Sequence, residues 1–145
     1  MLDTSALNRL VDDADALNAL VDKAGVLRVM ITHIQVDEVN RTSDAERKER
    51  LTALCALCTE VRTEGAVYDV SRYDEATYSS EGGQEIERIK IGNPKHAADA
   101  LIINTAEGLG CTLVMIDVPA VRRAARVAPN LNIISYETFR TSLLP

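Results

Sequence analysis

Short, uninterrupted apolar runs alternate along this chain with segments of helical periodicity. Continuous apolar runs are typical of strands that are buried on both faces, as in parallel sheets. Four segments fit this pattern: Val26–Ile31, Ala66–Val70, Thr112–Ile116 and Leu131–Ile134. A fifth strand is expected at the very start of the sequence, where only Met1 and Leu2 precede Asp3. Apolar spacings of three and four residues predict helices over Ser5–Asp12, Ala14–Lys23, Gln35–Arg41, Ala45–Arg62, Pro94–Leu109, Ala120–Val127 and Tyr136–Leu143. Strands separated by helices pair in parallel through crossovers, so we expect a three-layer α/β/α sandwich with a central, mostly parallel five-stranded sheet.

The stretch Ser71–Gly92 shows neither pattern. It contains the pair Gly82-Gly83, so we expect a loop there, with a short helix around Glu85–Lys90. Asn93-Pro94 comes next and is typical of a helix start, with asparagine as the N-cap and proline in the first helical position. Gly110 stands just after the same helix, where a C-cap glycine is expected.

The length of 145 residues indicates a single domain, residues 1–145. Hydrophobic residues make up 46% of the chain and aromatic residues only 3%, which argues against nucleic-acid binding by base stacking. The net charge of −6 means that a nucleic-acid partner would need metal ions or clustered basic residues to supply positive charge. The sequence shows no signal peptide or membrane-spanning segment, so we expect a cytoplasmic protein.

Three aspartates occupy positions that suit a catalytic site. Asp3 follows the first expected strand, Asp117 closes the fourth, and Asp99 interrupts an apolar helix. In open α/β sheets, ligands bind beyond the carboxyl ends of the strands. Glu38, one helical turn after the second strand, adds a fourth carboxylate. Because like charges gathered in one place persist mainly where a divalent metal neutralises them, the pattern predicts a site for Mg²⁺ or Mn²⁺.

Each of these carboxylates also has a structural interpretation. Asp3 could cap the following helix, Asp117 could begin a turn, and Glu38 could lie on a solvated helix face. Asp99 is harder to explain in this way. It lies six residues after the expected N-cap Asn93, beyond the turn where capping or the helix dipole favours an acid.

Histidines and cysteines do not point to a further site. We interpret His33 and His96 as parts of the local structure, because four carboxylates already suffice for a hard cation. Cys55 and Cys58 form a C-x-x-C pair, but they lie inside a predicted helix and no second ligand pair accompanies them. We therefore interpret them as ordinary thiols.

Taken in order, these residues resemble the motifs of the PIN-domain ribonucleases, a family that includes the VapC-type toxins of bacterial toxin–antitoxin pairs. The similar segments are Leu2-Asp3-Thr4-Ser5-Ala6-Leu7, Val36-Asp37-Glu38-Val39, Ala98-Asp99-Ala100-Leu101-Ile102 and Thr112-Leu113-Val114-Met115-Ile116-Asp117. The resemblance implies strand order 3-2-1-4-5, metal-dependent RNA cleavage and often a homodimer. It also implies a catalytic and metal-binding cluster of Asp3, Glu38, Asp99 and Asp117, with Thr4 or Ser5 donating a hydroxyl to the metal-bound water or to a phosphate oxygen.

Basic residues at the rim of such a site would hold the RNA backbone. The candidates are Arg41, Arg47, Lys48, Arg50, Lys90 and Lys95, of which Arg41 and Lys95 are assigned to substrate binding. An antitoxin protein would bind the apolar groove between the first helices and the helix Ala45–Arg62, and could bring an arginine to the acidic cluster.

Two other classes of α/β protein also carry aspartates at the ends of strands. A receiver-type phosphoacceptor needs an acidic pair after its first strand, and a haloacid-dehalogenase phosphatase needs Asp-x-Asp-x-Thr; the segment Asp3-Thr4-Ser5 satisfies neither. The fourth strand ends in Met115-Ile116-Asp117, whereas the family usually shows a Thr-Asn-Asp-like ending. The alternative is therefore a catalytically weakened PIN-like fold that acts as an RNA- or protein-binding regulatory module.

Overall fold

A computed structural model gives the fold and describes residues 1–67, 70–72, 74–77 and 93–144. The described part of the chain contains seven α-helices: α1 (Thr4–Leu10), α2 (Ala14–Asp22), α3 (His33–Asn40), α4 (Ala45–Ala56), α6 (Ala97–Gly108), α7 (Val118–Val127) and α8 (Tyr136–Leu143). The predicted helix around Glu85–Lys90 and the Gly82-Gly83 pair lie outside the described residues.

All strand pairs in the described residues are short and parallel. They are β1 (Met30–Thr32) with β2 (Thr59–Val61), β3 (Thr63–Glu64) with β4 (Ala76–Thr77), and β5 (Leu113–Val114) with β6 (Ile133–Ile134). The expectation of an α/β protein with parallel pairing is therefore confirmed. A five-stranded sheet is not assigned as such, because the pairs form three separate two-stranded sheets.

The first residues of the chain lie between β1 and β5. Leu2 forms a parallel bridge with Val114, and its N–H donates to the carbonyl of Met30 at 3.1 Å. On the other side, the Val114 N–H donates to the carbonyl of Met1 at 2.9 Å, and the Asp3 N–H donates to the carbonyl of Val114 at 3.1 Å. Backbone hydrogen bonds thus connect the two sheets through the segment that ends in Asp3.

Two predicted strands are placed differently. In the segment Val26–Ile31, the strand begins only at Met30, because Val26 belongs to the turn after α2 and is 89% exposed. The prediction of a strand over Ala66–Val70 is wrong for its described residues, 66, 67 and 70, which form no strand. Instead, β2 lies inside the predicted helix Ala45–Arg62, since that helix ends at Ala56. The β-branched Thr59 and Val61 favour extended backbone once a parallel partner is available in β1.

Helix ends are defined by short-range hydrogen bonds and backbone conformation. The side chain of Asp13 caps α2 by accepting the N–H of Ala16, and Ser135 caps α8 in the same way. Gly110 follows α6 with a φ of 60°, the left-handed conformation that favours glycine after a helix. The predicted helix Pro94–Leu109 is not continuous, however, because its first turn is a 3₁₀ helix, Pro94–His96.

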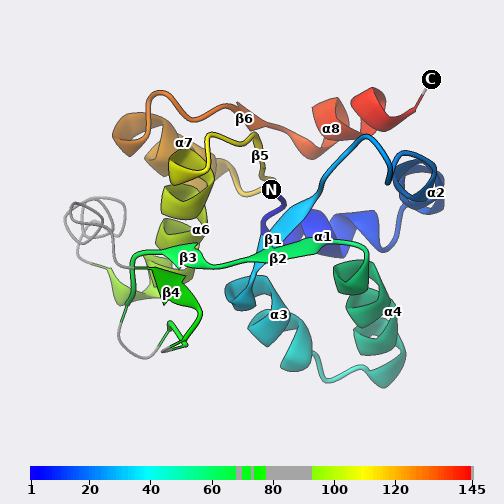
Figure 1. The fold of residues 1–145 in the computed structure, drawn as a ribbon, viewed down its shortest axis with the longest axis horizontal. Coiled ribbons are helices and arrows are strands. Elements are labelled where there is room, and N and C mark those ends of the chain that lie inside the picture. Colours follow the sequence, from blue (N-terminus) through cyan, green and yellow to red (C-terminus); the bar gives the residue numbers. More distant parts are fainter. Residues whose placement is uncertain (68–69, 73, 78–92, 145) are drawn as a thin grey trace.

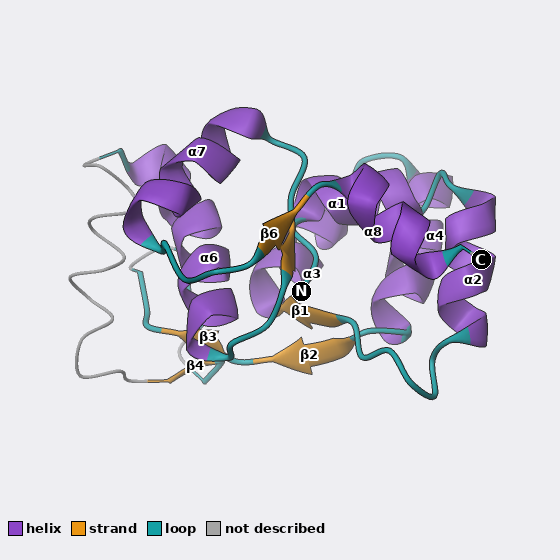
Figure 2. Ribbon diagram, turned by 90° about the horizontal axis from the view of Figure 1, so that it is seen from above, coloured by secondary structure: helices purple, strands orange, loops and turns teal. Residues whose placement is uncertain are grey.

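Helices cover the strands on two sides (Figures 1 and 2). The helices α6 and α7 lie on one side, and α2, α4 and α8 lie on the other. Each side has its own buried cluster of aliphatic residues. The first includes Leu7, Leu10, Leu51, Leu54 and Leu143, and the second includes Leu101, Ile103, Leu113, Ala120 and Ala124. Among the described residues, no helix is both long enough and apolar enough to cross a membrane.

Candidate functional site

Asp3 lies where the segment between β1 and β5 enters α1. Its side chain caps that helix: the carboxylate accepts the N–H of Ala6 at 2.6 Å and the hydroxyl of Ser5 at 2.7 and 2.9 Å. Asp3 is only 6% exposed, and this burial raises the pKa of its carboxyl. The hydrogen bonds from Ala6 and Ser5 act in the opposite direction, while the nearby charge of Asp99 raises the pKa further. The capping role is therefore confirmed, yet the surroundings still disfavour a charge on Asp3.

Asp117 lies at the N-terminus of α7, three residues after the end of β5. Its backbone carbonyl accepts the N–H of Val121 at 2.9 Å, so its main chain begins the helix. Its exposed side chain makes no capping hydrogen bond. The carboxylate of Asp117 is thus at the carboxyl end of β5 and is not used to cap α7.

Asp99 lies in the first turn of α6, which begins at Ala97. The expectation that it lies beyond the first turn is wrong, because the preceding residues Pro94–His96 form a separate 3₁₀ helix. The N-terminus of α6 therefore favours a negative charge at this position. Burial nevertheless raises the pKa of Asp99, and Asp117 raises it further, although Arg123 opposes both effects.

The structure brings Asp3, Asp99 and Asp117 into one electrostatic group. Asp99 acts on the charge of Asp3, and Asp117 acts on the charge of Asp99. They come from three different places in the fold: the segment beside β5, the first turn of α6 and the N-terminus of α7. Neighbouring carboxylates repel one another when they are charged, and a bound cation would relieve that repulsion.

Glu38 lies beside this group, on α3. It lines a small pocket of about 170 Å³ whose other lining residues are Ile34, Asp37, Arg41, Val70, Lys95 and Ala98. Ala98 is the residue before Asp99, so the pocket adjoins the acidic group. The fourth predicted carboxylate thus lies in a pocket that the residue before Asp99 also lines.

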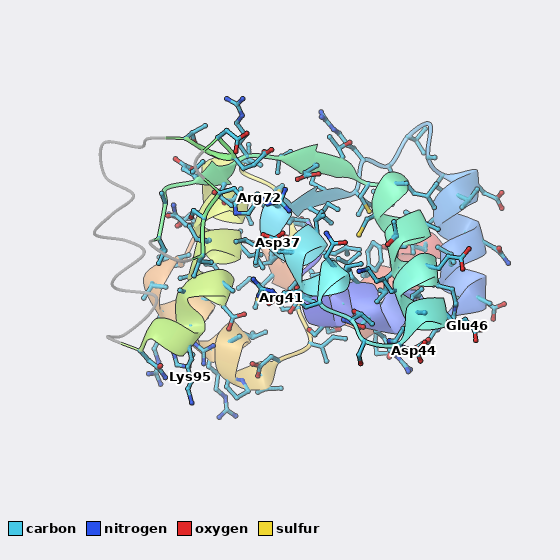
Figure 3. The ribbon with its side chains drawn as sticks, turned by 90° about the horizontal axis from the view of Figure 1, so that it is seen from below. Asp37, Arg41, Asp44, Glu46, Arg72 and Lys95 are labelled. Carbon is cyan, nitrogen blue, oxygen red and sulfur yellow. The ribbon has the colours of Figure 1, made fainter. Side chains whose placement is uncertain are left out.

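Arg41 and Lys95 line the same pocket and come from two different elements (Figure 3). Arg41 is the C-cap residue of α3, and Lys95 lies in the 3₁₀ helix before α6. Both side chains are exposed. Asp37, the neighbouring acid on α3, is already paired with Arg72 (Figure 3). Arg41 and Lys95 therefore border the pocket with cationic groups that an anionic ligand could contact.

The other basic candidates make contacts within the protein. Arg47 binds the carboxylate of Asp12 at 3.1 and 3.2 Å and the backbone and side-chain oxygens of Asn8 at 3.1 Å. Arg50 donates to the carbonyl of Val11, and Lys48 donates to the carbonyl of Asn40 at 2.7 Å. These contacts hold α4 against α1 and α3. Lys90 lies outside the described residues.

The two hydroxyls predicted to serve the site differ in their surroundings. The Ser5 hydroxyl is committed to the carboxylate of Asp3. The hydroxyl of Thr4 is buried and has no hydrogen-bond partner within the described part of the chain. His33 is fully buried at the start of α3, and its Nε2 accepts the backbone N–H of Arg72 at 3.4 Å. Its Nδ1 is buried and has no hydrogen-bond partner within the described part of the chain.

Arg123, which was not among the residues predicted for the site, contacts it directly. Its guanidinium donates to the carboxylate of Asp99 at 2.9 Å. A signal was present, because Ala120, Arg123, Ala124 and Val127 recur at spacings of three and four residues. An arginine in the apolar stripe of an amphipathic helix is expected to face inward, toward a carboxylate partner.

The side chains near Asp3, Asp99 and Asp117 offer oxygen atoms as possible ligands for a divalent cation. Carboxylate and hydroxyl oxygens are the ligands that Mg²⁺ and Mn²⁺ prefer, and the buried Thr4 hydroxyl is an unused oxygen beside Asp3. As the side chains stand, no three His, Cys, Asp or Glu side chains among the described residues lie close enough together to hold a metal ion. The donor types therefore fit a hard cation, and the side chains would have to move closer together to bind it.

Comparisons with protein-family models, with curated proteins and with solved structures find no match for this chain.

Proposed function

We propose that this chain is a metal-dependent endoribonuclease with a PIN-like fold, which hydrolyses RNA phosphodiesters. The observation that carries the proposal is the electrostatic group of Asp3, Asp99 and Asp117. The charge of Asp99 acts on Asp3 and that of Asp117 acts on Asp99, although the three acids are far apart in the sequence. Asp117 follows the carboxyl end of β5, the kind of position where open α/β folds bind their ligands. Two of the three have raised pKa values, so the group would gain stability from a bound cation.

The backbone hydrogen bonds support the PIN-like strand order. The order proposed is β2, β1, the first residues of the chain, β5 and β6, which is 3-2-1-4-5 along the sequence when β3 and β4 are left out of the count. Parallel pairing of β1 with β2 and of β5 with β6 supports its two ends. The bonds of Leu2 with Met30 and of Met1 and Asp3 with Val114 support its centre.

In this proposal Asp3 and Asp99 are the principal ligands of Mg²⁺ or Mn²⁺, and Asp117 and Glu38 bind the cation directly or through water. When bound, the cation lowers the pKa of a water molecule and neutralises charge that develops on the phosphate. Arg41 and Lys95, at the rim, bind the RNA backbone. The hydroxyl of Thr4 is available to donate to a phosphate oxygen, whereas that of Ser5 keeps the carboxylate of Asp3 oriented.

The proposal extends to the biological role as the toxin of a toxin–antitoxin pair, acting as a homodimer in the cytoplasm. An apolar pocket of about 280 Å³ supports an antitoxin partner, since it lies at the expected groove between α2 and the end of α4. Val21 and Leu57, which line it, are 49% and 53% exposed. Controlled expression in a bacterial host should arrest growth, and the Asp99→Asn variant should not. Unimpaired growth with the wild-type protein would argue against the toxin role alone.

A second candidate is a PIN-like module that binds RNA or protein without cutting it. The ion pair between Arg123 and Asp99 favours this candidate, because it already neutralises one acid of the group. The two candidates differ in a single measurable respect, which is whether RNA is cleaved when a divalent cation is present.

The decisive experiment is incubation of the purified protein with a panel of tRNA and rRNA fragments, with Mn²⁺ or with EDTA. We expect defined fragments with Mn²⁺ and none with EDTA. The Asp117→Asn variant should be inactive, and a matched control, Asp22→Asn on the exposed end of α2, should cleave as the wild type does. Cleavage that survives both EDTA and Asp117→Asn would rule out the proposed chemistry, and intact RNA in every reaction would favour the binding module.

A further inference from the structure

The helix α7 carries arginines both on its inner and on its outer side. Arg123 points inward, because its side chain is 14% exposed and donates to the carboxylate of Asp99 at 2.9 Å. The adjacent residue, Ala124, is fully buried. This packing fixes the rotation of α7 about its own axis. Arg122 and Arg126 are consequently turned toward solvent, and both are exposed.

Arg122 and Arg126 belong to an exposed stripe of α7 that begins beside the acidic group. Val118, Arg122 and Arg126 are spaced by four residues, so they lie on one face of the helix. Val118, which directly follows Asp117, is 56% exposed. Eight residues of helix rise by about 12 Å, so the stripe extends about that far from Asp117 along the axis of α7. In Figure 2, α7 lies at the outer edge of the molecule.

The positive charge of this stripe is not neutralised within the described part of the chain. Neither Arg122 nor Arg126 has an ion-pair partner among the described residues. The sequence contains no Asp or Glu from Val118 to Tyr136. The helix dipole favours a cation at Arg126, in the last turn of α7, but Arg122 lies before that turn. Like charges four residues apart on a helix repel each other, so an anion bound across the two arginines would relieve that repulsion.

A nucleic-acid backbone has the chemistry that fits this stripe. The planar guanidinium group offers paired N–H donors that match two oxygens of a phosphate. Because the chain as a whole carries a net charge of −6, it can attract a polyanion only through local clusters of cations. The stripe is a single row of side chains, which suits one strand. It starts at Asp117, one of the acids at which the proposed function places the phosphodiester, so a strand bound there would continue onto α7.

We propose that the exposed face of α7 binds the backbone of single-stranded RNA through Arg122 and Arg126, next to the acidic group. This inference rests on the proposed RNA substrate, and it adds α7 to the contacts proposed for Arg41 and Lys95. It does not require a bound cation. The two arginines contact phosphates and not bases, so they contribute affinity without a preference for sequence.

The first test measures the binding of a fluorescent pool of single-stranded RNA in EDTA at several salt concentrations, so that no divalent cation takes part. The Arg122→Gln, Arg126→Gln double variant should reduce the slope of log K against log salt by about 1.4, which is about 0.7 for each lost phosphate contact. The Lys23→Gln, Arg28→Gln control removes the same charge from the segment that follows α2, and its slope should match that of the wild type. Equal slopes in the wild type and the Arg122, Arg126 variant would overturn the inference. Cleavage with Mn²⁺ is measured separately, so the proposed function can stand when the inference fails.

The second test uses only the wild-type protein and covers the case in which the double variant fails to fold. Phenylglyoxal modifies arginines, and peptide mass spectrometry shows which ones have reacted. With the RNA at about ten times its Kd, modification of Arg122 and Arg126 should slow about tenfold by mass action, while that of Arg28 should not change. Poly-glutamate of equal total charge should protect the two arginines less.

Two results of the second test would overturn the inference. RNA that binds without protecting Arg122 and Arg126 would place the strand on another surface, and equal protection by poly-glutamate would make an acidic protein segment the partner. If the wild-type protein binds no RNA in EDTA, the inference is wrong, and cleavage with Mn²⁺ decides the proposed function on its own.

Discussion

The side-chain amide of Gln35 donates to the backbone carbonyl of Leu2 at 2.7 Å, and its oxygen accepts from the backbone and hydroxyl of Thr32 at 2.9 and 2.6 Å. Gln35 is fully buried in the first turn of α3. One side chain thus ties the end of β1 to the segment that leads into Asp3. The position of the first acid depends on a residue that is 32 positions further along the chain.

Replacement of Gln35 by leucine should therefore destabilise the protein. It would leave the Leu2 carbonyl and the Thr32 N–H buried without this partner, at a cost of about 2 kcal/mol or more in the free energy of unfolding. Urea denaturation provides the measurement. Asn132→Ala is a suitable control, because it removes an exposed amide hydrogen bond to Thr112 and should cost less than about 0.5 kcal/mol. Equal effects of the two substitutions would show that Gln35 does not position the segment.

Asp99→Asn should abolish RNA cleavage and raise the melting temperature of the metal-free protein at neutral pH. The pKa of Asp99 is higher in the folded protein than in the unfolded chain. At pH values between these two pKa values, the folded protein therefore binds the proton of Asp99 more tightly than the unfolded chain does. The unfolding free energy contributed by Asp99 therefore falls as pH rises through that window, which starts near pH 4. Asparagine removes this loss. The gain is expected to be on the order of a few degrees, because the side chain is partly exposed and solvent screens its charge.

Thermal melts from pH 3.5 to pH 7.5 check this prediction. Wild-type protein should lose stability relative to Asp99→Asn as the pH rises, and the two curves should approach each other at the acidic end. Asp22→Asn, on an exposed surface, serves as the control for removing a charge. A variant that melts lower than the wild type at pH 7 and still cuts RNA with Mn²⁺ would show that Asp99 is structural.

Arg41 and Lys95 should contribute to RNA affinity, whereas Arg47 should contribute to stability. In an Asp117→Asn background, which prevents cleavage, Arg41→Gln and Lys95→Gln should each reduce the slope of log K against log salt by about 0.7. Arg47→Gln should leave that slope unchanged and lower the unfolding free energy slightly, since it loses its contacts with Asp12 and Asn8. A slope that responds only to Arg47→Gln would place the RNA on a different surface.

The thiol of Cys58 should be unreactive in the folded protein. Burial raises its pKa to about 12, with a smaller contribution from Cys55, and its sulfur donates to the carbonyl of Leu54 at 3.4 Å. Alkylation by iodoacetamide at pH 8 should be roughly a hundredfold slower than in urea, because the thiolate is the reactive form. A Cys55→Ser, Cys58→Ser double variant should retain RNA cleavage. Rapid labelling of Cys58, or zinc binding that depends on the pair, would contradict its interpretation as an ordinary thiol.

The sequence was most informative where a local signal acts within a few residues. The left-handed Gly110 after α6 follows from backbone sterics, because glycine adopts this conformation without a clash. It was least informative for the third strand. The helical pattern of Ala45–Arg62 ends early, because Thr59–Val61 pairs with β1, a partner that is distant in sequence. The secondary-structure propensity of a segment cannot predict its pairing with a strand that is distant in the sequence.

The sequence by itself determined the alternation of helices and parallel strands and the positions of Asp3 and Asp117 at strand ends, since both depend on hydrophobic periodicity. Only the tertiary structure decided which charges meet. It placed Arg123 of α7 on Asp99 of α6, put Glu38 in a neighbouring pocket, and turned Arg47 toward Asp12. The reason is that Coulombic contacts depend on distances between elements, and those distances are set by how the helices pack on the strands.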